Sequence, residues 1–234
     1  MELISRRRFL QAAALAVPGS TIVACRGDAD ARTGDSALAA HGFLLDVEKR
    51  FLDAAIDRLI PGDLDSPGAL QAGVTTFIDL QLAGPFGSAQ TWYMQGPWRE
   101  GTEQQGYQLK LTPAQLYRIA IRNIRAHCAK TYGRDFDGLP AATRDKVLHG
   151  LEKATIELAD VPAKTFFDLL WQNTQEGFLS DPMYGGNRDF AGWKLIGFPG
   201  PRYNYVEEIG QFGKPYTRST VGLKGRTDLR SKAG

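Results

Sequence analysis

The sequence predicts an all-α fold. Apolar residues recur at helical spacing in five segments, Pro, Gly and capping residues mark the ends of these segments, and no run of residues alternates convincingly with period two. A chain of 234 residues that is 43% apolar and 23% charged has the composition of one globular domain with a sizeable core. We therefore expect a compact helical bundle of about five main helices, with long aromatic and glycine-rich loops and an extended C-terminal arm.

The first two expected helices lie before residue 86. The first follows Phe43 and stops at Pro61-Gly62, and its apolar face consists of Phe51, Leu52, Ala55, Ile56, Leu59 and Ile60. The second has Ser66 as its cap and Pro67 at its first helical position, and it runs to Gly84-Pro85. Its apolar stripe consists of Leu70, Val74, Phe77 and Ile78.

Three further helices are expected. The third begins with the capping box Thr112-Pro113-Ala114-Gln115, in which the Thr hydroxyl and the Gln side chain satisfy backbone N–H groups, and its stripe is Tyr117, Ile121, Ile124 and Cys128. The fourth opens at Pro140 with a stripe of Val147, Leu151, Ala154 and Leu158. The fifth opens at Pro162 and ends before Gly177, with a stripe of Phe166, Leu169, Leu170 and Trp171.

The N-terminus carries an export pattern. Ser5-Arg6-Arg7-Arg8-Phe9-Leu10-Gln11 fits the twin-arginine signal, whose critical residues here are Arg6, Arg7, Phe9 and Leu10. The apolar stretch behind it, Leu10 to Ala24, is interrupted by Pro18 and Gly19 and is shorter than the ~20 apolar residues that a membrane-spanning helix needs. We expect a chain that is exported in the folded state to the periplasm.

The sequence offers two alternative sites at which the signal could be processed. Ile22-Val23-Ala24-Cys25 resembles a lipobox with Cys25 as the lipidated residue, whereas Ala37-Leu38-Ala39 offers a small-residue cleavage site. Either way we expect a signal and leader over 1–39, a helical domain over 40–213 and a basic arm over 214–234. Cys128 is the only cysteine outside the leader, so the body has no intrachain disulfide.

The charge distribution argues against nucleic acid as a partner. Glu2 and the three arginines Arg6, Arg7 and Arg8 account for the whole formal charge of +2. The remaining body is neutral, and nucleic-acid binding needs a concentrated basic surface. Arg118, Arg122 and Arg125 line one side of the third helix, where they form either a solvated face or a contact for an acidic partner.

Two segments are unusually rich in aromatic residues and glycine. They span residues 86–108 and 178–205, and long loops in a folded domain are commonly functional. Aromatic residues and Arg are typical of the centre of protein interfaces. We predict a partner interface formed by Trp92, Trp98, Tyr184, Arg188, Phe190, Trp193, Phe198 and Tyr203. The alternative is that these side chains cover the helices of the same chain.

Catalytic motifs are missing from the sequence. It contains no dinucleotide fingerprint, phosphate loop, Cys-x-x-Cys-His haem site or zinc spacing, and its three histidines are scattered. His127 and Cys128 are adjacent in a helix and so point roughly 100° apart rather than forming a nucleophile pair. We expect a buried structural Cys128, and no catalytic, cofactor-binding or metal-binding residue in this chain.

The segment around Tyr184 resembles a known family. Asp181-Pro182-Met183-Tyr184-Gly185-Gly186-Asn187-Arg188-Asp189, continued by Ala191-Gly192-Trp193-Lys194 and Gly197-Phe198-Pro199-Gly200, is similar to the gluconate 2-dehydrogenase subunit 3 family. The resemblance runs from about Phe51 to Phe198. It also includes Leu59-Ile60-Pro61, Gly73-Val74, Phe77-Ile78-Asp79, Ala83-Gly84-Pro85 and Gly177-Phe178.

The resemblance implies a non-catalytic small subunit of a periplasmic flavin-dependent gluconate, sugar or polyol dehydrogenase. The implied partners are a large flavoprotein of the glucose-methanol-choline type that holds FAD, a multihaem cytochrome c subunit, and the twin-arginine translocon that exports the flavoprotein with this chain. Two alternatives stay open. One is an independent periplasmic hydrolase that works through Asp181, Arg188 and Asp189; the other is a lipoprotein adaptor unrelated to redox chemistry.

Overall fold

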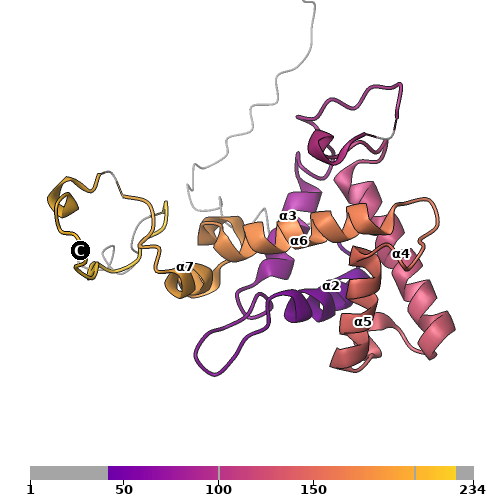
Figure 1. Ribbon diagram of the computed structural model, residues 1–234, viewed down its shortest axis with the longest axis horizontal. Helices are drawn as coiled ribbons and strands as arrows, with labels where there is room; N and C mark the ends of the chain where they lie inside the picture. The colour runs from indigo at the N-terminus through magenta and orange to yellow at the C-terminus, as the bar shows by residue number, and fades with distance from the viewer. Residues whose placement is uncertain (1–41, 100, 203, 225–234) are drawn as a thin grey trace, which may run out of the picture. The chain divides into compact units, whose positions relative to one another are not determined.

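Six α-helices form the part of the chain that the computed structural model describes, which is residues 42–99, 101–202 and 204–224. The helices are α2 (Asp46–Leu59), α3 (Val74–Ala83), α4 (Pro113–Tyr132), α5 (Ala141–Glu152), α6 (Ala163–Leu179) and α7 (Ala191–Ile196) (Figure 1). The same residues contain five single turns of 3₁₀ helix. Four lie between these helices, at Glu103–Gln105, Phe136–Gly138, Pro182–Tyr184 and Arg188–Phe190, and Val206–Glu208 follows α7. No strand occurs in these residues, so the all-α prediction is confirmed.

The described residues belong to a unit that spans 38–234. The expected leader lies outside the described residues, including Arg6, Arg7, Phe9, Leu10 and Cys25. Within 42–99, 101–202 and 204–224, none of the helices has the length and apolarity required to cross a membrane.

The core lies where α6 packs against α3, α4 and α5, and where α2 packs against α3 and α5 (Figure 1). Four aromatic rings fill its centre: Phe51 lies 4.8 Å from Phe136, and Tyr117 lies edge-on 5.4 Å from Phe166, measured between ring centroids. The Tyr117 hydroxyl donates a 2.8 Å hydrogen bond to Asn173 Oδ1, so its buried polar atom is satisfied.

The capping box predicted for the third helix is present at the start of α4. Gln115 N–H donates to Thr112 Oγ1 at 3.3 Å, and Thr112 N–H donates to Gln115 Oε1 at 2.9 Å. The predicted stripe of α4, from Tyr117 to Cys128, is buried. The entry signal and the apolar spacing of this helix are both confirmed.

The second helix begins later than predicted, at Val74 rather than Pro67. Asp63 Oδ1 accepts the N–H group of Ser66 at 2.7 Å, so Ser66 belongs to a turn and does not cap a helix. A Cβ at Gly68 would lie 2.3 Å from Gly62 N, which shows that the two backbones touch there. Gly73 then takes a φ of +80° directly before the helix.

The ends of the fourth and fifth helices also differ from the prediction. α5 ends at Glu152, and Ala154 beyond it has a φ of +51° that no α-helix accommodates. α6 continues through Gly177 to Leu179, because this glycine lies against α3 and does not end the helix. Phe166, Leu169 and Leu170 are buried as expected, but Trp171, also expected on the buried stripe, is 37% exposed.

The two aromatic segments differ in structure. Residues 84–112 are mostly irregular, and Trp92 packs between Phe86 and Tyr107 at centroid distances of 5.7 and 5.1 Å. Residues 182–196, expected as a loop, contain two 3₁₀ turns and the short helix α7. These elements are too short for the spacing of their apolar residues to indicate a helix.

The arm from Lys214 is free of helix and strand as far as the structure describes it, to Lys224. It turns back, because Leu223 N–H donates a 2.6 Å hydrogen bond to Asp181 Oδ2 at the end of α6. The backbone N–H of Val221 also donates to Pro199 O at 3.3 Å. The start of the basic arm is therefore attached to the segment that carries the family resemblance.

Candidate functional site

Asp181 follows α6 and organises the candidate site through its carboxylate. Oδ1 accepts the N–H group of Met183 at 3.0 Å, which caps the turn Pro182–Tyr184, and Oδ2 accepts the N–H group of Leu223. The residue is buried, and a backbone N–H group donates to each of its carboxylate oxygens. This arrangement favours a structural role for Asp181.

Asn187 is fully buried and joins the end of α6 to the start of α7. Its Nδ2 donates to Ser180 O at 2.7 Å, and its Oδ1 accepts Gly192 N–H at 2.9 Å. Its φ of +47° lies in the left-handed region, which Asn tolerates better than most residues. One side chain therefore supplies both the turn and two buried hydrogen bonds.

Glycines bring the backbone of this segment against α6. A Cβ at Gly186 would lie 2.1 Å from Gly177 O, and a Cβ at Gly192 would lie 2.1 Å from Phe178 O. Real Cβ atoms do not approach carbonyl oxygens so closely, so only glycine fits at these two positions.

The same segment is also fixed to the start of α3. Arg188 N–H donates to Ala72 O at 2.9 Å. A Cβ at Gly73 would lie 3.2 Å from Arg188 Nη2 and 3.2 Å from Gly185 O, so the guanidinium and the turn both lie against that glycine. The Gly-Gly-Asn-Arg sequence thus connects α3, α6 and α7 through hydrogen bonds and close backbone contacts.

Trp193 on α7 packs inside its own chain. It is 5% exposed, and its indole Nε1 donates to Leu179 O at 2.6 Å. Phe190 stacks on it at 5.5 Å between centroids, and Phe198 meets it edge-on at 4.9 Å. This is the within-chain packing that stood as the alternative to a partner contact for Trp193.

Exposed apolar side chains are concentrated after α6. Ten of the seventeen large apolar side chains that are exposed among the described residues lie between residues 183 and 223. We call these ten residues the C-terminal apolar set: Met183, Tyr184, Leu195, Ile196, Phe198, Tyr205, Val206, Ile209, Phe212 and Leu223. Such a concentration of exposed apolar residues is typical of a surface that another macromolecule covers.

The predicted interface residues are distributed over two regions. Trp92 is half-buried and Trp98 is 39% exposed in the segment before α4, whereas Tyr184, Arg188 and Phe198 are exposed and Phe190 is half-buried around α7. Tyr203 lies outside the described residues. Contact of any of these residues with a partner stays a prediction.

Of the C-terminal apolar set, the sequence analysis named only Tyr184 and Phe198 as interface residues. Leu195, Ile196, Ile209 and Phe212 are between 57% and 91% exposed, yet none was singled out. Apolar residues in short helices and irregular segments have no period that separates an outer face from an inner one. Only the density of apolar residues after a glycine-rich segment could have indicated them.

The described residues include one buried cysteine thiol, Cys128. No group of three His, Cys, Asp or Glu side chains there could hold a metal ion. Burial, aided by the negative charge of Asp135, raises the pKa of the Cys128 thiol to about 11, so this thiol is protonated at neutral pH. Cys128 is buried, as expected for a structural cysteine.

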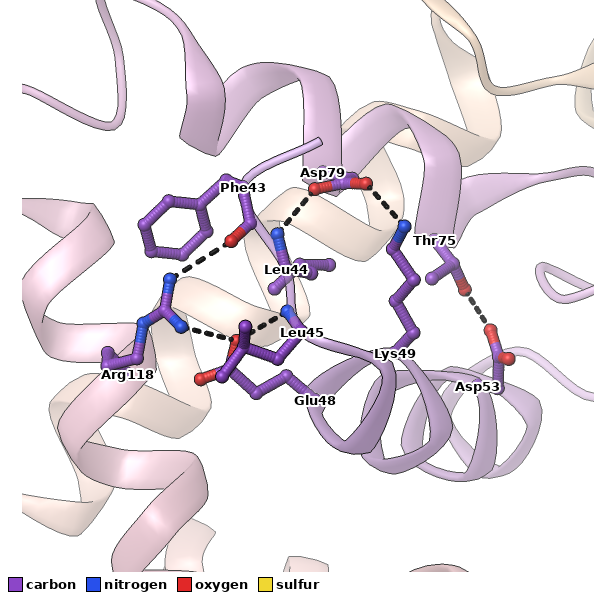
Figure 2. Close-up of polar contacts among 9 residues, drawn as sticks. All are labelled: Phe43, Leu44, Leu45, Glu48, Lys49, Asp53, Thr75, Asp79 and Arg118. Carbon is purple, nitrogen blue, oxygen red and sulfur yellow. Dashed lines mark hydrogen bonds and ion pairs between the residues drawn. The ribbon is translucent and has the colours of Figure 1, made fainter. Parts of the chain in front are cut away.

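A second polar cluster fixes the start of the folded body (Figure 2). Buried Asp79 on α3 accepts Leu44 N–H at 2.8 Å and pairs with Lys49 Nζ at 3.2 Å. Arg118 on α4 donates to Phe43 O at 3.0 Å and lies 4.3 Å above the Phe43 ring centroid.

Glu48 completes this cluster from α2. Its Oε2 accepts Leu45 N–H at 2.9 Å and pairs with Arg118 Nη1 at 3.1 Å, and the residue is 5% exposed (Figure 2). Arg125 pairs with Asp135 at 2.6 Å. Two of the three arginines expected along α4 therefore make contacts within the chain, and Arg122 is exposed.

The protein is all-α, with a glycine-rich connector at residues 185–188 and the C-terminal apolar set between residues 183 and 223. A family model described as gluconate 2-dehydrogenase subunit 3 matches residues 46–200. This chain belongs to the gluconate 2-dehydrogenase subunit 3 family. Comparison with curated proteins and with solved structures found no match to either.

The matched range coincides with the elements described above. It begins at the first residue of α2 and ends directly after the segment that Trp193 and Phe198 anchor. The predicted family resemblance is thereby confirmed, and it places the chain among accessory subunits of an oxidoreductase complex.

Proposed function

We propose that this chain is the non-catalytic small subunit of a periplasmic, FAD-dependent dehydrogenase of gluconate, sugars or polyols. It binds a large flavoprotein of the glucose-methanol-choline type, assists its folding and assembly, and takes it through the twin-arginine translocon. A multihaem cytochrome c subunit receives the electrons, and the complex is associated with the inner membrane. FAD and haem c reside in the partner subunits.

Membership of the gluconate 2-dehydrogenase subunit 3 family is the observation that carries this proposal. The C-terminal apolar set adds support, since it would cost free energy to leave so many large apolar side chains in water. The twin-arginine pattern at Arg6 and Arg7 supports export in the folded state, which suits a partner that acquires its flavin before it crosses the membrane.

Export of the partner can be tested with a charge-conserving change in the signal. Replacing Arg6 and Arg7 by Lys keeps the positive charge but removes the two guanidinium groups of the export pattern. We expect the flavoprotein and its dye-linked dehydrogenase activity to remain in the cytoplasm. The activity is measured in periplasmic, membrane and cytoplasmic fractions of cells that express all subunits.

Arg8→Lys is the matched control, because Arg8 occupies the variable position between the arginine pair and Phe9. This variant should leave the periplasmic activity unchanged. If the Arg6→Lys/Arg7→Lys variant also leaves it unchanged, the flavoprotein does not depend on this chain for export. Turnover by the purified chain alone would support the hydrolase alternative instead.

A further inference from the structure

A cavity of about 430 Å³ lies in the segment between α3 and α4. Four aromatic side chains line it, which are those of Trp92, Tyr93, Trp98 and Tyr107. Its volume lies in the range of roughly 300–1,000 Å³ that is usual for small-molecule sites. None of its lining residues belongs to the C-terminal apolar set, so the cavity is a separate candidate site.

Two of the four rings are fixed by contacts within the chain. Trp92 packs between Phe86 and Tyr107, and the Tyr107 hydroxyl donates a 2.6 Å hydrogen bond to Leu111 O. Because this hydroxyl is already bonded, Tyr107 offers its ring to a ligand rather than its polar atom. Rings that are held in place before a ligand arrives lose little conformational entropy when it binds.

The other two rings are open to solvent. Tyr93 is 81% exposed and Trp98 is 39% exposed. A Cβ at Gly96 would lie 3.3 Å from Trp98 Cδ1, so the indole lies close to the backbone of that glycine. A ligand that covers the Trp98 ring removes apolar area from water, which favours binding.

Amide and guanidinium groups also line the cavity. They belong to Gln95, Arg99 and Gln108, and Gln108 Nε2 donates to Gln105 O at 2.9 Å. An amide has both N–H donors and a carbonyl acceptor, so it can pair with a hydroxyl in either sense. Of the described residues that line the cavity, none is Asp, Glu or Lys.

This combination of groups favours one class of ligand. A purely apolar molecule would take the amides and the guanidinium out of water without giving them a hydrogen-bond partner, which costs free energy. A small inorganic ion would leave the rings uncovered. A sugar or polyol has C–H groups that pack against the electron-rich ring faces and hydroxyls that pair with the amides.

We propose that this cavity binds a monosaccharide, a sugar acid or a polyol. C–H groups of the ligand pack against Trp98, its hydroxyls bond to Gln95 and Gln108, and Arg99 offers a charge-assisted donor to the carboxylate of a sugar acid. The ligand class is the one proposed as substrate of the complex. The site goes beyond the proposed function, because it gives the small subunit a ligand of its own.

The test titrates the purified full-length chain with D-glucose, D-gluconate and D-sorbitol, each up to about 50 mM, at which a millimolar complex is saturated. Saturation-transfer-difference NMR measures the Kd and identifies the C–H groups in contact with the protein. Trp98→Ala removes one ring, and Trp98→Phe keeps an aromatic face. Trp171→Ala is the matched control, because Trp171 on α6 is 37% exposed and does not line the cavity.

We expect saturable binding of at least one probe, with the Kd raised at least about tenfold by Trp98→Ala, recovered in Trp98→Phe and unchanged in Trp171→Ala. Circular dichroism confirms that each variant is folded. Absence of saturable binding would overturn the proposal, and so would equal effects of Trp98→Ala and Trp171→Ala.

A proline-rich peptide is the rival occupant, since aromatic grooves also bind polyproline helices. Binding of a polyproline peptide but of none of the three probes would therefore count against a sugar site. Gln95→Leu separates the two further, because it removes a partner for hydroxyls and should weaken only sugar binding. No flavoprotein is present in these titrations, so a negative result leaves the proposed function untouched.

Discussion

Asn187 shows how one residue type can meet several requirements at once. It adopts a positive φ, donates to Ser180 O and accepts from Gly192 N–H while it is fully buried. An Asn beside two glycines is commonly part of a turn on the protein surface. Burial reverses that expectation, because the amide takes the place of backbone partners that the end of α6 lacks.

Replacing Asn187 by Ala should lower the free energy of unfolding by about 1–3 kcal/mol, since Ser180 O and Gly192 N–H would remain buried without partners. Asn204→Ala is the control, because Asn204 is exposed and its side chain accepts a 3.3 Å hydrogen bond from Val206 N–H. Urea unfolding followed by circular dichroism measures both variants. Equal stabilities of the two variants would contradict a structural role for Asn187.

Cys128 provides a second residue-scale prediction, about reactivity. Burial and Asp135 raise the pKa of its thiol to about 11. In a Cys25→Ser variant, where Cys128 is the sole thiol, we expect alkylation at about pH 8 to be at least roughly a hundredfold slower in the folded than in the unfolded chain, since the thiolate is the reactive form. Maleimide labelling followed by mass spectrometry measures both rates. A folded chain that reacts as fast as the unfolded one would show that Cys128 is accessible.

At the level of elements, the sequence predicted those helices that have a capping signal at the start and a regular apolar face. The capping box at Thr112 and the stripe that follows it were sufficient for α4. The start of α3 could not be predicted, because Ser66 and Pro67 have the residue types of a helix start. The close contact between Gly62 and Gly68, which the sequence does not reveal, places them in a turn. The end of α6 was not predicted for a related reason: glycine is common directly after a helix, but Gly177 lies inside α6 where the helix contacts α3.

Gly177 allows α6 and α3 to approach closely. A Cβ there would lie 2.8 Å from Phe77 Cδ1 and 3.0 Å from Val74 Cγ1. We expect Gly177→Val to destabilise the fold by about 1–3 kcal/mol through overpacking. Gln175→Val is the control, because Gln175 is an exposed residue of the same helix. Chemical denaturation measures the difference, and an unchanged or higher stability of Gly177→Val would show that α3 and α6 separate at no cost.

Across the whole molecule, the helices form a core and the exposed apolar residues gather after it. The interface predicted in the glycine-rich segment includes Trp193, which the structure buries, and the sequence analysis did not single out Ile209 and Phe212, which are 79% and 91% exposed. Aromatic composition identifies a region and does not tell an inward-facing ring from an outward-facing one. That distinction depends on contacts between distant residues, such as Trp193 Nε1 with Leu179 O.

The C-terminal apolar set should decide assembly with the flavoprotein. Ile209 and Phe212 are 79% and 91% exposed, so replacing both by Asp should leave the fold intact and weaken assembly, because each removes apolar contact worth about 1.5–3 kcal/mol when fully buried. Leu64→Asp with Tyr93→Asp is the control, since these residues are 104% and 81% exposed but lie before α4. Size-exclusion chromatography of the co-expressed subunits measures the fraction assembled. A larger loss in the control would place the interface elsewhere.

In the proposed function, this chain works as one subunit beside a flavin-carrying partner. The most direct test is affinity purification of the tagged chain from cells that express its neighbouring genes, followed by the flavin absorbance spectrum and mass spectrometry of the eluate. We predict a flavin spectrum together with a glucose-methanol-choline-type flavoprotein in about equal amount to this chain. Recovery of the chain alone without that flavoprotein, or of flavin bound to this chain by itself, would contradict the proposal.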